Sequence, residues 1–261
     1  MNLSDVFCSK RLDSSKHEFL IKGFNLILLF FLISFICVFL FSSQIYEWNT
    51  VLAYKTVFVS GWIKTGVLSV ISLLLSVVIG LITALMGKST VRLIRYLALF
   101  YVEIIRGTPL LVQLLAFFYV VGTALDINSR LLIGVLTLSL FSGAYIAELI
   151  RSCIDSVQKS HLDSAKAIGM TPLQTYRFII LPMMMRQILP PLAGQFASII
   201  KDSSLLSILG IREFTYSAQQ ISSATYSTLE SYFPLAVGYL ILTLPISILS
   251  KTLEKRFKYE S

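Results

Sequence analysis

Four ionisable residues interrupt two long apolar stretches of this sequence. They are Glu103 and Arg106 within Tyr96–Val121, and Lys201 and Asp202 within Ile188–Ile211. A charged side chain is costly inside a bilayer, so each of the four should face protein or water instead of lipid. Such residues either hold helices together as ion pairs or border a path for polar solutes.

Glu103 and Arg106 are three residues apart and can pair on one face of a helix. We favour this structural ion pair, near the inner end of its span, because intramembrane charges generally find partners. Pro109 follows Gly107 and Thr108. This order predicts a kink that frees backbone carbonyls to line a cavity.

Lys201 and Asp202 are adjacent, so about 100° of helix rotation separates them and they cannot face each other directly. With Ser203 and Ser204 they could border a pathway and receive the carboxylate and ammonium groups of an amino acid. The alternative is that each pairs with a neighbouring span and holds the shape of the pore. The sequence leaves both interpretations open.

The sequence contains no recognisable catalytic or metal-binding pattern. Only His17 and His161 are present, and no H-E-x-x-H occurs. Ser142-Gly143 lacks the first glycine of a G-x-S-G pattern, because position 140 is Leu140, and no span supplies a histidine base. Metalloprotease chemistry is therefore excluded by the number of ligands, and the sequence argues against an intramembrane enzyme of another kind.

A phosphate-binding loop is also missing. Gly87-Lys88-Ser89 resembles the end of the pattern G-x-x-x-x-G-K-[ST], but the required first glycine is replaced by Ile82. The tripeptide also ends an apolar helix instead of following a strand. If ATP drives this protein, another subunit must hydrolyse it.

The composition identifies the elements that carry these residues as membrane helices. Of the 261 residues 56% are hydrophobic and 14% are charged, and the net charge is +8. Soluble domains have about 25% charged residues. About 20 apolar residues cross a bilayer, which predicts one all-α membrane domain of about six spans. The predicted spans are Gly23–Phe41, Val67–Met86, Tyr96–Val121, Leu131–Ala147, Ile188–Ile211 and Ser231–Ser250.

The distribution of basic residues predicts the orientation of the spans. If both termini are cytoplasmic, sixteen Lys and Arg residues lie inside. The outside segments then contain only Lys55, Lys64, Arg130 and Arg212. This bias satisfies the positive-inside rule. The basic residues of the inside segments account for the net charge of +8, so this charge does not indicate a nucleic-acid-binding protein.

The longest predicted inside loop comprises residues 151–186. Ser160 to Asp163 is typical of a capped helix start. Gly169 suits the left-handed conformation just beyond a helix end. Thr171-Pro172 then predicts an N-cap and a first-turn proline for a second short helix, which runs toward Pro182. Leu162, Ala165 and Ile168 should form an apolar strip, which packs either on the protein's own helices or on a partner.

Three segments resemble those of permease subunits in bacterial ABC importers, within the polar amino acid uptake branch (histidine, glutamate, glutamine, arginine and opine permeases). The segments are Glu103–Gln113, Glu148–Pro182 and Lys201–Leu205. Glu148 and Arg151, also three apart, should form an ion pair that anchors the loop.

The resemblance implies a type I importer fold with a cytoplasmic coupling helix. The permease core would comprise residues 61–251. Residues 1–60 would add a cytoplasmic tail, an extra span and an external loop, and residues 252–261 would form a basic tail. The implied coupling residues are Ser160, His161, Leu162, Asp163, Ser164, Ala165, Ala167, Gly169, Leu181 and Pro182. The expected pathway residues are Glu103, Arg106, Gly107, Thr108, Pro109, Lys201, Asp202, Ser203 and Ser204.

The resemblance also implies the partners and the location. The chain would be a multi-pass protein of the bacterial inner membrane, working as a homo- or heterodimer with two ATPase subunits, an external amino acid-binding protein and an amino acid substrate. ATP and Mg would bind to the ATPase, and this chain would bind no cofactor or metal.

Three departures from the family pattern fall in the coupling loop. Asp163-Ser164-Ala165 replaces the usual Glu-Ala-Ala, Ser160-His161 replaces the usual Gly-Gln, and Pro182-Met183-Met184 replaces the usual Pro-Gln-Ala. His161 can titrate near neutral pH, so partner choice could differ. An ion-coupled secondary amino acid transporter is the alternative, although such folds usually contain paired repeats, which this sequence lacks.

Overall fold

The structure is a computed structural model that describes residues 33, 36, 48–156 and 159–258. Contacts divide the chain into Met1–Glu47 and Trp48–Ser261, and the following concerns the second unit. The predicted span Gly23–Phe41 lies outside the described residues, apart from two isolated positions.

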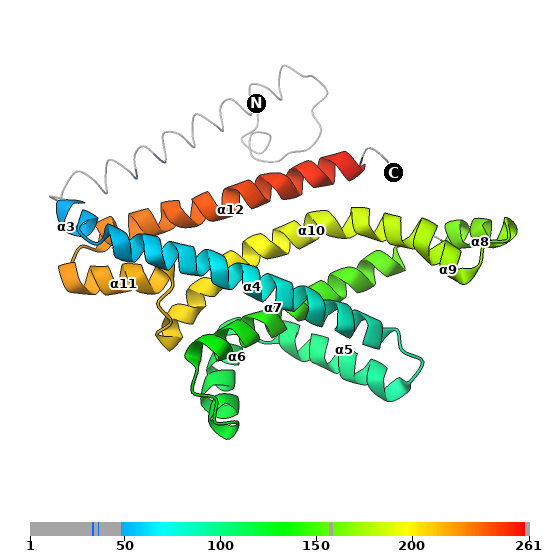
Figure 1. The fold of residues 1–261 in the computed structure, drawn as a ribbon, viewed down its shortest axis with the longest axis horizontal. Helices are drawn as coiled ribbons and strands as arrows, with labels where there is room; N and C mark the ends of the chain where they lie inside the picture. Colours follow the sequence, from blue (N-terminus) through cyan, green and yellow to red (C-terminus); the bar gives the residue numbers. More distant parts are fainter. Residues whose placement is uncertain (1–32, 34–35, 37–47, 157–158, 259–261) are drawn as a thin grey trace, which may run out of the picture. The chain divides into compact units, whose positions relative to one another are not determined.

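The described part of the chain is helical and contains no strand (Figure 1). Its α-helices are α3 (Trp48–Leu52), α4 (Lys55–Gly87), α5 (Arg92–Gly107), α6 (Leu110–Ala116), α7 (Arg130–Asp155), α8 (Lys159–Ala167), α9 (Pro172–Thr175), α10 (Leu181–Asp202), α11 (Phe214–Thr225) and α12 (Thr228–Lys258). Two π-helical segments, η1 (Phe117–Gly122) and η2 (Tyr176–Ile180), and the 3-10 helix η3 (Ser203–Leu209) complete it. The predicted all-α class is confirmed.

Three of these helices, α4, α7 and α12, are long and apolar enough to cross a membrane. The predicted span Tyr96–Val121 is instead a pair, α5 and α6–η1, bent by 110°. The helix α4 begins at Lys55, twelve residues before the predicted start at Val67. The predicted span included only uncharged residues, whereas the helix extends past Lys64, which lies on its exposed side. The predicted span at Ile188–Ile211 becomes α10 and η3; α10, with 22 residues, is long enough to cross a membrane but is less apolar than α4, α7 and α12.

The helices α4 and α7 pack closely because each inserts isoleucine against a glycine of the other. A Cβ atom on Gly80 of α4 would lie 2.6 Å from Cγ2 of Ile146 on α7. A Cβ atom on Gly143 of α7 would lie 2.7 Å from Cγ2 of Ile79 on α4. Small residues at such crossings let helix backbones approach closely in membranes.

A fully buried carboxylate, that of Glu213, joins α4, α11 and α12. It caps α11 by accepting hydrogen bonds from the backbone N–H groups of Thr215 and Tyr216, both at 2.8 Å. It also accepts from the hydroxyls of Thr65 on α4 (3.2 Å) and Tyr239 on α12 (3.1 Å). Burial raises the pKa of Glu213, although these four donors oppose the shift. The end of the bundle opposite α8 and α9 is therefore held by one polar network (Figure 1).

Candidate functional site

The predicted glycine corner ends α8. Gly169 has φ +76°, the left-handed conformation that favours glycine. Its N–H donates to the carbonyl of Lys166 and that of Met170 donates to Ala165, both at 3.0 Å. These two bonds form the Schellman motif, which satisfies the last carbonyls of the helix. The helix begins at Lys159, so Ser160 lies inside it and is not its N-cap as predicted.

The second helix of the loop starts as predicted and ends differently. The Thr171 hydroxyl accepts from the N–H of Gln174, whose side chain accepts from the N–H of Thr171, and Pro172 occupies the first turn. The helix does not stop at Pro182, because the π-helical segment η2 precedes it and leads directly into α10. A π-turn suits this place because proline has no N–H to donate to the preceding turn.

The apolar strip of the loop is divided between the protein's interior and its surface. Ala165 is buried, whereas Ile168 and Leu173 are each 76% exposed. Ser164, Ala167 and Pro182 are exposed, and Asp163 pairs with Lys166 at 3.9 Å in the open. The side chains of residues 160–162 lie outside the description. The corner between α8 and α9 therefore presents two large apolar side chains away from the helix bundle.

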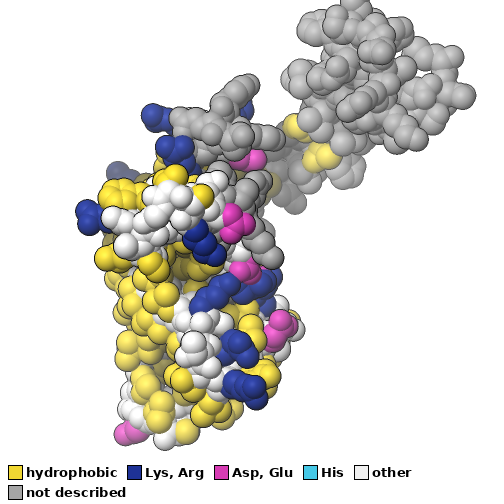
Figure 2. Space-filling view, turned by 90° about the vertical axis from the view of Figure 1, so that its right-hand side faces the viewer, with side chains coloured by type: hydrophobic (Ala, Val, Ile, Leu, Met, Phe, Trp, Pro, Cys, Tyr) yellow, Lys and Arg dark blue, Asp and Glu magenta, His cyan; other side chains and the backbone are white. Residues whose placement is uncertain are grey.

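This end of the molecule is also rich in charge. Figure 2 views it directly and shows Lys and Arg side chains spread over the face, with fewer Asp and Glu side chains among them. The surface contrasts with the apolar flanks of the long helices, whose exposed residues are mainly Leu, Ile and Val.

A chain of ion pairs connects α4, α5 and α7 at the same end. Lys88, which follows α4, contacts Asp155 at 2.5 Å, and Asp155 contacts Arg151 at 3.1 Å. Arg151 donates to Glu148 through Nε at 2.9 Å and also through Nη2. Arg106 of α5 reaches the same carboxylate at 3.7 Å. The Glu148–Arg151 pair is thus present, as one link of a larger network.

The expected pair between Glu103 and Arg106 does not form. Arg106 lies over the ring of Tyr145, 5.4 Å from its centroid, and this places its guanidinium beside Glu148 on α7. Glu103 is exposed and forms no salt bridge within the described part of the chain. The i, i+3 spacing would allow Glu103 and Arg106 to pair, but Arg106 instead contacts the ring of Tyr145 and the carboxylate of Glu148 on the neighbouring helix α7.

The bend between α5 and α6 occurs where Gly107, Thr108 and Pro109 predicted it. Gln113 fills the bend and is buried. Its Nε2 donates to the carbonyl of Ile105 at 2.7 Å and to the carbonyl and hydroxyl of Thr108 at 3.1 and 2.7 Å. The carbonyls freed by the break are therefore satisfied by a side chain, while Oε1 of Gln113 is buried without a hydrogen-bond partner.

Replacing Gln113 by leucine should destabilise the bend. The carbonyls of Ile105 and Thr108 would lose their donor, which costs about 2 kcal/mol. We expect a lower melting temperature of the purified protein, with Gln219→Leu on the exposed side of α11 as a control that leaves it unchanged. Equal melting temperatures for the two variants would show that Gln113 does not support the bend.

The second charged cluster lies where α10 passes into η3. Lys201 is exposed and Asp202 is partly exposed, and neither forms a salt bridge with another described residue. Ser204 is partly exposed. Ser203 is fully buried and donates to the carbonyl of Ile200 at 2.7 Å. Of the four predicted pathway residues in this cluster, Ser203 therefore faces the interior of the chain.

Residues 76–259 match the protein family described as "Binding-protein-dependent transport system inner membrane component". The chain belongs to this family. It is a membrane permease subunit of an ABC importer, and a separate subunit hydrolyses ATP. The comparisons favour this function over the ion-coupled carrier.

Two curated relatives cover most of the permease. The glutamine transport system permease protein GlnP of Escherichia coli (strain K12) is 33% identical over 216 residues, which make up 82% of this chain and 98% of GlnP. The probable glutamine ABC transporter permease protein GlnM of Bacillus subtilis (strain 168) is 34% identical over 203 residues, which make up 78% of this permease and 94% of GlnM.

Solved structures agree on the fold. The crystal structure of an amino acid ABC transporter with histidines superimposes with a TM-score of 0.76 at 35% identity, covering 82% of this permease and 100% of that chain. The inward-facing MetNI methionine ABC transporter gives a TM-score of 0.66 at 16% identity, covering 78% and 98%. The predicted type I importer fold is thus confirmed.

Sequence reasoning missed the roles of Gln113 and Glu213. Gln113 was noted only as part of a motif, although a long amide four residues after a proline is well placed to reach carbonyls freed by a break. Glu213 stands directly before the amphipathic start of α11, where an acidic side chain is a recognisable N-cap.

Proposed function

We propose that this permease imports a polar amino acid of the glutamine class. Support comes from the glutamine permeases GlnP and GlnM, each covered almost in full, and from the amino acid transporter at 35% identity. Within the chain, the observation that carries the proposal is the exposed, unpaired Lys201 beside the partly exposed Asp202. One cation and one anion at the end of α10 match the carboxylate and ammonium of a zwitterion.

Lys201→Met and Asp202→Asn, made separately, test this assignment. Because neither side chain has a described salt-bridge partner, each variant should keep the melting temperature of the wild type while the KM for uptake rises about tenfold, which corresponds to the loss of one charge-assisted hydrogen bond. Uptake of radiolabelled glutamine into vesicles loaded with ATP measures KM. Lys251→Met, at the exposed end of α12, is the matched control. Unchanged KM and selectivity in both variants would reject direct recognition.

We propose further that the corner between α8 and α9 docks on the ATPase subunit. Ile168 and Leu173 are exposed apolar groups on a charged face, a typical composition for a protein interface. ATP and Mg would bind on that ATPase. The corner would therefore be cytoplasmic, with both termini on the same side, in the inner membrane of a bacterium.

A second permease copy, identical or related, and an external binding protein would complete the transporter. The pathway would lie where the exposed charges of α5 and α10 meet the second copy, and Glu103 would lie beside it.

The chain of ion pairs from Lys88 to Arg106 would transmit movement of the coupling loop to α5, because it connects the C-terminal part of α7 to both α4 and α5.

A further inference from the structure

Three cationic side chains surround one apolar cavity at the end of the bundle opposite α8. Lys64 of α4, Arg130 at the start of α7 and Arg212 before α11 all line it. The cavity has a volume of about 510 Å³. These three are among only four basic residues that the sequence places in outside segments, so the fold collects charges that are 148 positions apart in sequence at their extremes.

Among the residues that the structure describes, no acidic group lines the cavity or pairs with these three cations. Glu213 follows Arg212 directly, but its carboxylate is fully buried and occupied by four donors from other groups. Arg130 makes one long hydrogen bond, at 3.4 Å, to the carbonyl of Leu209. The site therefore retains an uncompensated positive charge.

The floor of the cavity is apolar and continues along α4. Ile63, Val67, Ile71 and Leu131 line it, and each is about half exposed. Further along α4, Leu74 and Val78 are also exposed, so the apolar surface extends toward the middle of a membrane-spanning helix. The surface therefore has cations at one end and apolar side chains along the rest, which suits a ligand with an anionic head and a hydrocarbon tail.

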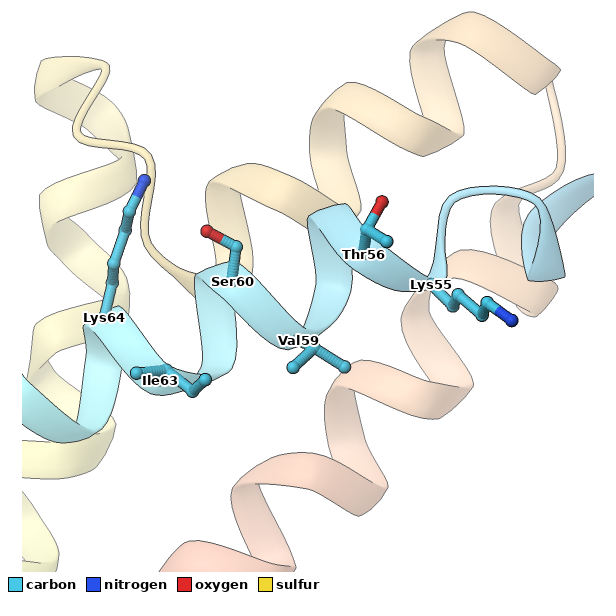
Figure 3. A pocket seen from close by; sticks show the side chains of 6 residues that line it. All are labelled: Lys55, Thr56, Val59, Ser60, Ile63 and Lys64. Atoms are coloured by element: carbon cyan, nitrogen blue, oxygen red, sulfur yellow. The ribbon is translucent and has the colours of Figure 1, made fainter.

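A second cavity, of about 610 Å³, shares Ile63 and Lys64 with the first. Figure 3 shows that Thr56, Ser60 and Lys64 point to one side of α4, while Val59 and Ile63 point to the other. Lys64 extends along the segment between η3 and α11, and Lys55 points away from it at the start of the helix. Lys64 lines the first cavity together with the two arginines, and Ser60 points to the same side of α4 one turn before it.

We infer that this cavity binds an anionic phospholipid, with the phosphate among Lys64, Arg130 and Arg212 and the acyl chains along the exposed face of α4. Guanidinium groups bind phosphate oxygens in a bidentate geometry, and the lysine stem can lie on apolar surface while its ammonium reaches the headgroup. A zwitterionic amino acid fits less well, because the lining offers nothing to its ammonium group. An acidic protein surface would leave the apolar floor without a partner.

The first test is lipid retention by the complete transporter. It is purified in mild detergent from native membranes, and bound phospholipid is identified by mass spectrometry for the wild type and for Lys64→Gln/Arg212→Gln. The double variant spares Arg130, which bonds to the backbone of Leu209. Lys251→Gln/Lys255→Gln on α12 removes the same charge from exposed positions at the other end. We expect the wild type and the control to retain anionic phospholipid and the double variant to lose it.

The second test separates lipid from a free anion. In nanodiscs, phosphatidylglycerol should raise the melting temperature of the wild type above its value in phosphatidylcholine with the same acyl chains by about 3 °C. The double variant should lose this shift. Glycerol 3-phosphate added to the phosphatidylcholine nanodiscs should have no effect, since it lacks acyl chains for the apolar floor.

Three results would overturn the inference. Equal lipid retention by the double variant and the control would show that the cations do not hold the lipid. An equal shift with glycerol 3-phosphate would show a simple anion site. A photoreactive residue in place of Val67 that crosslinks to another protein chain of the transporter, instead of to lipid, would show that a subunit covers the cavity. None of these readouts depends on substrate uptake, so the proposed function is tested independently.

Discussion

Replacing Ile168 and Leu173 by aspartate should abolish ATP-driven uptake and release the ATPase subunit while leaving the permease folded. Both side chains are 76% exposed. Their loss therefore costs the isolated permease little stability. At the centre of an interface, each buried anchor residue contributes about 2 kcal/mol, so each substitution should weaken ATPase binding about 30-fold. Co-purification through a tag on the permease measures the binding, and uptake measures the consequence.

Leu125→Asp provides the matched control for this experiment. Leu125 is also an exposed leucine, 64% accessible, but it follows η1 in the connection to α7. The control should keep both the ATPase and uptake. If the variant at the corner between α8 and α9 retains the ATPase as fully as this control, the corner is not the docking site.

Replacing Glu213 by leucine should produce the largest loss of stability of any single substitution considered. The change removes the shared acceptor of four donors, the N–H groups of Thr215 and Tyr216 and the hydroxyls of Thr65 and Tyr239, of which the Thr65 hydroxyl is buried and the other three are partly buried. At about 1 kcal/mol for each donor, the loss is about 4 kcal/mol. In a chain of this size it should lower the melting temperature by about 10 °C.

Glu213→Gln separates the hydrogen bonds from the charge. Burial raises the pKa of Glu213, so the neutral amide is a reasonable substitute for the side chain, and it keeps one oxygen as an acceptor. Its melting temperature should fall between those of the wild type and Glu213→Leu. Glu254→Leu, on the exposed side of α12, should match the wild type. A small loss with Glu213→Leu would mean that the three helices are held together by packing alone.

The sequence predicted local features of the coupling loop well because they depend on neighbouring residues. Gly169 adopts the left-handed conformation, and Thr171 and Pro172 begin the next helix as expected. These features follow from backbone conformation and capping, which involve residues within a few positions. The continuation of the helix through Pro182 was missed, because a π-helical segment has no signature in composition.

Contacts between distant residues were predicted less well. Spacing placed Arg106 beside Glu103, but only the packing of α5 on α7 brings it to Glu148. The hypothesis that Ser203 borders the pathway rested on its place beside Lys201 and Asp202, whereas its side chain is fully buried at the start of η3. In both cases the outcome depends on which helix lies alongside, and this information is not contained in one segment of sequence.

The paired contacts of Gly80 with Ile146 and of Gly143 with Ile79 determine where the permease can move. Each isoleucine packs against a glycine at a distance that leaves no room for a Cβ atom. If α4 slid along α7 by one residue, each isoleucine would face a residue larger than glycine and would clash with it. We therefore expect these two helices to move together as one rigid unit.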